Sequence, residues 1–81
     1  MKIRVHVTPR RGVLDPQGQA VAGGLRSLGF GSTGEVRVGK AIDIELEGIS
    51  SSDEAVAIGR QMAQKLLANE IVEDFSVEVI S

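Results

Sequence analysis

Few side chains in this sequence could take part in catalysis, and they are scattered along the chain. His6 is the single histidine, and it alternates with apolar residues in a pattern typical of the exposed face of a strand. The chain has no cysteine, and the serines at positions 50–52 have no neighbouring base that could activate them. Helix capping explains these serines better than nucleophilic attack does. We therefore expect no catalytic residue in this chain.

The sequence also lacks the patterns that hold a cofactor or a metal ion. Gly29-x-Gly31 supplies two glycines of a dinucleotide-binding fingerprint, but the third glycine and the strand-to-helix context are missing. No Walker sequence occurs, and one histidine without cysteines cannot build a zinc site of the thiolate or multi-histidine kind. We therefore expect no cofactor-binding and no metal-ligating residue here.

The stretch TPRRGVLDPQGQAV, from Thr8 to Val21, holds the most unusual polar residues. Arg10 and Arg11 precede Asp15-Pro16, where Asp is a good N-cap and Pro suits the first position of a helix. A helix N-terminus attracts anions, but the Asp15 carboxylate would repel a phosphate there. Three interpretations remain open: docking of a partner, which we favour, a turn with a helix cap only, and direct phosphate binding.

Length and composition limit the class of protein. Eighty-one residues make one domain, which we take as residues 1–81. A net charge of −2 and only two aromatic residues disfavour nucleic-acid binding, and no apolar run is long enough to span a membrane. We therefore expect neither nucleic acid nor a membrane as a partner. The absence of cysteine is compatible with a reducing compartment, and we expect a cytoplasmic protein.

Hydrophobic periodicity predicts five elements in the order β-α-β-α-β. Apolar and polar residues alternate, as in strands with one buried face, over residues 2–8, 35–47 and 73–81. Helical spacing of apolar residues follows the Asp15 cap, and it recurs between the capping box Ser51-x-x-Glu54 and Asn69. The sequence therefore predicts an α+β fold in which two helices cover one face of an antiparallel sheet.

Charge indicates which strand is central. The outer face of the first strand is basic, with Lys2, Arg4 and His6. The outer faces of the other two strands are acidic, with Asp43, Glu45, Glu47, Asp74 and Glu78. Opposite charges on neighbouring strands attract each other, so we expect the first strand to lie between the other two.

The strand over residues 35–47 is too long for so small a domain. Its apolar residues keep even numbers through Gly39, so it is one long strand, which we favour, or a hairpin around Gly39-Lys40-Ala41 without the usual turn signal. Thirteen strand residues span about 43 Å, whereas a compact domain of this size is about 30 Å across. The strand must bend at Gly39 or extend into a second subunit. We expect a homodimer that shares this strand between two sheets, and the sequence leaves further association open.

Four stretches of the sequence resemble the PurS family, the small subunit of phosphoribosylformylglycinamidine (FGAM) synthase in purine biosynthesis. They are GVLDPQGQAV, LRSLGF, EVRVGKAIDIELEG and KLLANEIVEDFSVEV, and they lie in the family's order and spacing over essentially the whole chain. The resemblance implies a non-catalytic subunit of a ligase complex that forms a C–N bond with glutamine as amide donor. It also implies a dimer whose exchanged strands build two ferredoxin-like halves.

The resemblance further implies two larger partners. A glutaminase subunit (PurQ) would release ammonia, and a synthetase subunit (PurL), which binds ATP and Mg, would convert formylglycinamide ribonucleotide to formylglycinamidine ribonucleotide. The small subunit would bridge them and assist ammonia transfer. The residues that we expect to dock a partner are Arg10, Arg11, Asp15, Gln17, Arg37 and Lys40.

A second hypothesis is a free-standing ACT-like regulatory module that binds a small ligand at a dimer interface. Such a module would need a loop with glycine and aspartate ligands directly after the first strand. This sequence has Pro9-Arg10-Arg11 there instead, which disfavours the regulatory module.

Overall fold

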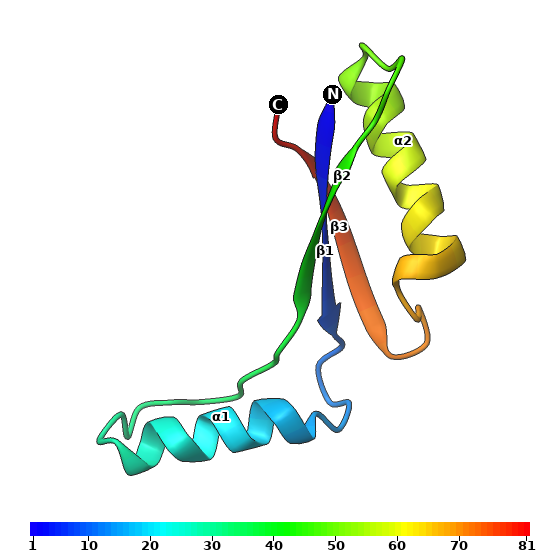
Figure 1. Cartoon of the computed structure of the whole chain (residues 1–81). Helices are drawn as coiled ribbons and strands as arrows, with labels where there is room; N and C mark the ends of the chain where they lie inside the picture. The colour runs from blue at the N-terminus through cyan, green and yellow to red at the C-terminus, as the bar shows by residue number, and fades with distance from the viewer.

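A three-stranded antiparallel sheet with one helix packed on it forms the larger part of the computed structural model, which describes residues 1–81 (Figure 1). The elements are β1 (Lys2–Pro9), α1 (Pro16–Ser27), β2 (Lys40–Glu45), α2 (Ser52–Met62), the π-helical turn η1 (Ala63–Leu67) and β3 (Glu73–Val79). The predicted order β-α-β-α-β is confirmed, and the sheet is antiparallel throughout.

The sheet order is β2-β1-β3, so β1 is the central strand as its charges predicted. Arg4 pairs with Asp43 of β2, with Nε 2.7 Å from Oδ1. His6 pairs with Glu78 of β3, with Nε2 3.2 Å from Oε1. The exposed face of the sheet is therefore covered by charge pairs that cross from the central strand to both neighbours.

The opposite face of the sheet carries the core. Ile3, Val5 and Val7 of β1 are almost fully buried beneath α2 and η1. The helix can approach closely because its inner positions are small. A Cβ atom added at Gly59 would lie 2.7 Å from Cγ1 of Val77 and 2.8 Å from Cδ1 of Ile3. Gly59 therefore fixes the distance between α2 and the sheet.

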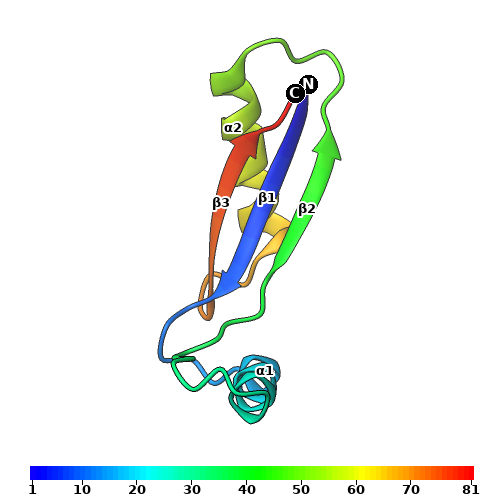
Figure 2. The same cartoon turned by 90° about the vertical axis from the view of Figure 1, so that its left-hand side faces the viewer.

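The helix α1 does not pack on the sheet of its own chain. It lies beyond the end of β1, and the residues after it run back alongside it (Figures 1 and 2). Within one chain only α2 and η1 cover the sheet, so the expectation of two helices on one face is not met there. Gly24 of α1 has no atom within 4 Å of an added Cβ, so no close contact with the sheet requires glycine there.

The prediction of one long strand over residues 35–47 is wrong in its bounds within one chain, because β2 covers only Lys40–Glu45. Residues 34–39 pair with no strand of the chain, and they do not fold back on β2, so the hairpin alternative is wrong. The chain passes the end of β1 closely at Gly39, where an added Cβ would clash with the carbonyl oxygen of Val7. Leaving the ladder at this point carries residues 34–39 away from the sheet.

The chain is elongated, with extents of 49 × 26 × 14 Å. Its radius of gyration is 15.7 Å, against about 12 Å for a compact domain of this length. Its accessible surface is 5509 Å², which is about 800 Å² more than a compact 8.6 kDa protein exposes. Eight large apolar side chains are at least 36% exposed within one chain, so apolar side chains are part of this surface.

Candidate docking surfaces on the sheet and the arm

The residues from 10 to 39, which hold α1 and the extended segment after it, form an arm that projects from the sheet (Figure 1). Two of the predicted docking residues lie where the arm meets the sheet. Arg10 forms an ion pair with Asp74, with 3.5 Å between Nε and Oδ1, and its backbone N–H donates to Val72 O at 2.8 Å. Arg37 donates from Nη1 to Pro9 O at 3.3 Å. Both guanidinium groups thus lie at the end of β1.

Asp15, a third predicted docking residue, is bonded to the backbone of its own chain at both carboxylate oxygens. Oδ1 accepts from the Gly18 N–H at 3.0 Å, which is the predicted helix cap, and Oδ2 accepts from the Val38 N–H at 2.9 Å. These N–H donors, Val38 first and then Gly18, hold the pKa of Asp15 below its ordinary value. Asp15 therefore has a structural role that the cap alone does not explain.

The other three predicted docking residues are exposed. Arg11 lies in the loop before α1, and Lys40 opens β2 opposite Val7. Gln17 lies in the first turn of α1, one helical turn before Val21 on the same side of the helix. Arg10, Arg37 and Lys40 therefore gather at the end of β1, whereas Gln17 lies farther along the arm.

An apolar groove that the sequence did not predict runs along α2 and η1 beside β2. Its volume is about 580 Å³, and its lining consists of Ile44, Ile58, Gln61, Met62, Lys65, Leu66 and Leu67. Leu66 is 84% exposed, which is unusual for a leucine in the apolar stripe of a helix. The stripe from Ile58 to Leu66 was visible in the sequence, but the small size of the sheet beneath it was not.

The arm carries an uncovered apolar stripe of its own. Val21 is 42% exposed, and Leu28 is 76% exposed. A different side of α1, at Gly18 and Ala22, is buried. The exposed stripe is therefore free to contact another surface, while the small residues pack within the arm.

The outer edge of β2 is also unpaired. Met1 and Leu46 exchange backbone hydrogen bonds, with 2.7 Å from Leu46 N to Met1 O and 3.1 Å from Met1 N to Leu46 O. Hydrogen-bonded pairs alternate along an antiparallel ladder, so the even-numbered residues of β2 point their backbone groups at β1. The backbone groups of residues 41, 43 and 45 consequently point to the free edge.

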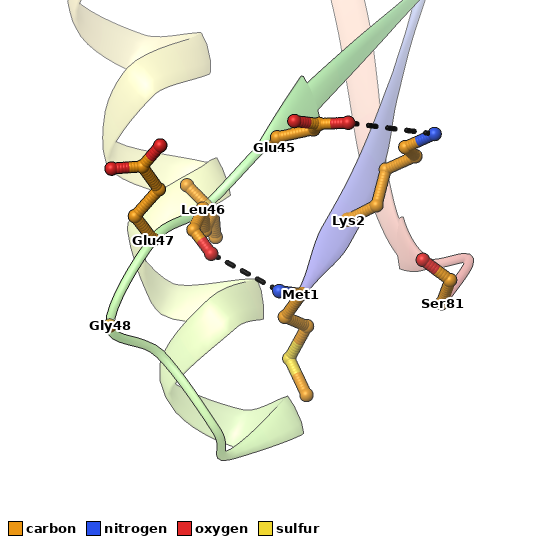
Figure 3. A pocket seen from close by; sticks show the side chains of 7 residues that line it. All are labelled: Met1, Lys2, Glu45, Leu46, Glu47, Gly48 and Ser81. Carbon is orange, nitrogen blue, oxygen red and sulfur yellow. Dashed lines mark hydrogen bonds and ion pairs between the residues drawn. The ribbon is translucent and has the colours of Figure 1, made fainter.

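A polar pocket of about 520 Å³ lies at the end of the sheet away from the arm (Figure 3). Met1, Lys2, Glu45, Leu46, Glu47, Gly48 and Ser81 line it. Nζ of Lys2 lies 4.0 Å from Oε1 of Glu45, and neither histidine nor cysteine contributes to the pocket. No three His, Cys, Asp or Glu side chains converge as metal ligands anywhere in the structure, and none of its helices could cross a membrane. The features that stand out are the apolar groove, the exposed stripe of α1 and the free edge of β2.

Comparison with known proteins identifies the family. The profile of the PurS family, described as phosphoribosylformylglycinamidine (FGAM) synthase, matches residues 2–81. The chain belongs to the PurS family. The PurS subunit of FGAM synthase from Bacillus subtilis is 37% identical over 78 residues, which are 96% of this chain and 90% of that subunit. The subunit from Synechocystis is 42% identical over 78 residues, which are 94% of this chain and 75% of that protein.

Solved PurS structures also share this fold. The Thermotoga maritima PurS subunit superposes with a TM-score of 0.84 at 29% identity, covering 98% of this chain and 90% of that one. Bacillus subtilis PurS superposes with a TM-score of 0.78 at 35% identity, covering 99% and 98%. The elongated arrangement, with α1 away from the sheet, is therefore similar to that of solved PurS chains.

Proposed function

We propose that this chain is the non-catalytic small subunit of an FGAM synthase complex, which makes formylglycinamidine ribonucleotide for purine biosynthesis. The names of its relatives support this role, since each is a PurS subunit of that synthase. Association surfaces dominate the structure, which suits a bridging subunit. In this proposal the glutaminase subunit PurQ supplies ammonia, and the synthetase subunit PurL binds ATP and Mg. The small subunit holds them together in the cytoplasm and assists ammonia transfer.

We further infer that two copies form a homodimer in which the arm of each copy packs on the sheet of the other. Three observations support this inference: β2 has an unpaired edge, a groove beside it is unfilled, and the arm carries both an unpaired extended segment over residues 34–39 and an uncovered apolar stripe. Residues 34–39 of one copy would extend the other copy's sheet beyond β2. Val21 and Leu28 would enter the groove beside Met62 and Leu66 of that copy.

The size of the uncovered surface supports the same dimer. Each chain exposes about 800 Å² more than a compact protein of its mass, which is about the area that one partner contributes to a standard interface. A two-fold axis near Lys40 would place the arm of each copy on the sheet of the other copy. The two copies would then make the same contacts with each other, and the dimer would be symmetric and closed. Each half would then have four strands and two helices, as in a ferredoxin-like fold.

Reconstitution with separately purified PurL and PurQ tests the subunit role. Glutamine-dependent formation of formylglycinamidine ribonucleotide should require this chain, and the same reaction with ammonia should depend on it less, since free ammonia needs no transfer path. The chain alone should show no turnover. Full glutamine-dependent activity without this chain would contradict the proposal.

The ACT-like regulatory module is not favoured, because the PurS profile covers nearly the whole chain. Titration calorimetry of the isolated chain with glutamine, ATP and ADP separates the two hypotheses. A subunit that only bridges should bind none of them tightly, whereas a regulatory module should bind one at its dimer interface.

A further inference from the structure

The arm is held together by polar contacts at both of its ends. Near the sheet, Asp15 joins the first turn of α1 to Val38 through the 3.0 Å and 2.9 Å hydrogen bonds from Gly18 N and Val38 N. Near the tip, Arg26 donates to Thr33 O and Gly34 O, each at 3.2 Å. The extended segment over residues 33–38 is therefore fixed to the helix at both ends.

Between these ends the two backbones lie in direct contact. An added Cβ at Gly18 would clash with the carbonyl oxygen of Val36, and it would also lie 2.6 Å from Oδ2 of Asp15. Gly18 is buried although it lies in the first turns of a helix that leaves most of its surface exposed. Only glycine fits this contact. Gly18 weakens the helix locally, but it allows residues 33–38 to pack against α1.

We propose that Asp15 and Gly18 form a latch that fixes residues 33–38 against α1 before the arm meets a second copy, which makes Asp15 a positioning residue for dimer assembly. This proposal rests on the dimer inferred above. The latch uses the N–H of Val38 and meets the carbonyl of Val36. Alternate residues of an extended chain point their backbone groups to opposite sides. The backbone N–H and C=O groups of Glu35 and Arg37 therefore point away from α1 and can pair with a strand of the second copy.

The latch matters because ordering a flexible segment opposes association. Each backbone residue that becomes fixed loses conformational entropy, and a segment that is ordered beforehand avoids this loss at the moment of binding. Opening the latch should therefore weaken the dimer even though Asp15 bonds within its own chain. The helix cap alone would not have this effect.

Two substitutions at one position separate the latch from the cap. Asp15→Ser keeps a side-chain oxygen that can cap α1, but a single short hydroxyl cannot also reach Val38, whereas Asp15→Ala removes both contacts. Ser51→Ala is the matched control, because it removes the cap of α2, whose Oγ accepts from Glu54 N at 3.4 Å. Circular dichroism verifies that each variant is folded.

The measurements are the dimer dissociation constant, from sedimentation equilibrium, and hydrogen exchange at the Val38 amide. Both Asp15 variants should raise the dissociation constant about tenfold and speed exchange at Val38. Ser51→Ala should leave both quantities near the wild-type values. Wild-type dimer affinity in Asp15→Ser would overturn the latch and leave only a cap.

The two proposals can fail separately. A wild-type chain that stays monomeric at all accessible concentrations would overturn the dimer and, with it, the role of the latch in assembly. Rapid exchange of Val38 in a wild-type dimer would overturn the latch alone.

Discussion

The two helices of this chain share the same local features but have different surroundings. Both begin at a capping side chain, Asp15 for α1 and Ser51 for α2, and both carry an apolar stripe. The helix α2 buries its inner face on the sheet, whereas α1 leaves Val21 and Leu28 exposed. An apolar stripe therefore indicates that a face is to be covered, but it does not indicate which molecule covers it.

The glycines of the two helices show the same contrast. Gly59 of α2 meets the side chains of Ile3 and Val77 in the core. Gly18 of α1 meets a backbone carbonyl within the arm. Gly59 allows close packing of α2 on the sheet, whereas Gly18 allows close packing within the arm, which we expect a second copy to cover.

The largest expected difference between the two halves concerns stability. Ile3→Ala should lower the free energy of unfolding by about 2–5 kcal/mol, because Ile3 is fully buried and the cavity cannot collapse completely. Leu28→Ala should change it far less at dilutions where the chain is monomeric, and it should weaken dimerisation. Urea denaturation at several protein concentrations measures both effects. An equal loss for the two variants at the lowest concentration would mean that α1 is packed within one chain.

A smaller effect is expected within the arm itself. Gly18→Ala should destabilise the arm, since the new methyl group clashes with the Val36 carbonyl, a backbone atom that cannot move alone. Gly23→Ala is the control, because its Cβ would meet nothing within 4 Å and alanine favours a helix by up to about 1 kcal/mol. Thermal unfolding followed by circular dichroism should therefore shift in opposite directions for the two variants. Equal shifts would show that the arm does not need the close contact at Gly18.

The sequence predicted the local features of this fold well. The caps at Asp15 and Ser51 could be predicted because each depends on only a few adjacent residues. The central place of β1 followed from charge alone. The length of the alternating stretch over residues 35–47 predicted that part of it would extend beyond the domain, and residues 34–39 do leave the sheet.

The sequence could not reveal contacts that depend on the direction in which the chain leaves the sheet. The bond from Val38 to Asp15 joins residues 23 positions apart, and no periodicity predicts it. The groove beside Leu66 exists because α1 lies elsewhere, which the apolar stripe of α1 does not reveal. Of the six docking candidates, the structure gives Asp15 a structural role and leaves the others as predictions.

Acid should affect both halves modestly. The hydrogen bond from Arg4 holds the pKa of Asp43 below its ordinary value, and backbone N–H groups do the same for Asp15. A carboxyl whose pKa is lowered by folding stabilises the folded state above its unfolded pKa, and this contribution is lost as the pH falls through its folded value. Stability should therefore decline below about pH 4. Asp43→Asn should reduce this decline in urea titrations between pH 7 and 3, and an unchanged pH profile would count against the Arg4 pair as its source.

The smallest effect on stability is expected at Arg10 and Arg11, where the consequence should lie in assembly instead. Replacing both with Ala breaks only an exposed ion pair to Asp74, and such pairs contribute about 0–1 kcal/mol, so the fold should stay intact. If these side chains form a basic rim that meets acidic groups on a larger subunit, association with PurL and PurQ should slow, and the defect should shrink as salt rises, because rim charges mainly steer encounter. Glutamine-dependent activity should fall more than ammonia-dependent activity when the small subunit is limiting.

Titrating the variant into the complex at two salt concentrations measures both activities and their dependence on salt. Arg60→Ala, on the exposed side of α2, is the control. Unchanged glutamine-dependent activity at low salt would mean that this end of the arm serves only to turn the chain and begin a helix.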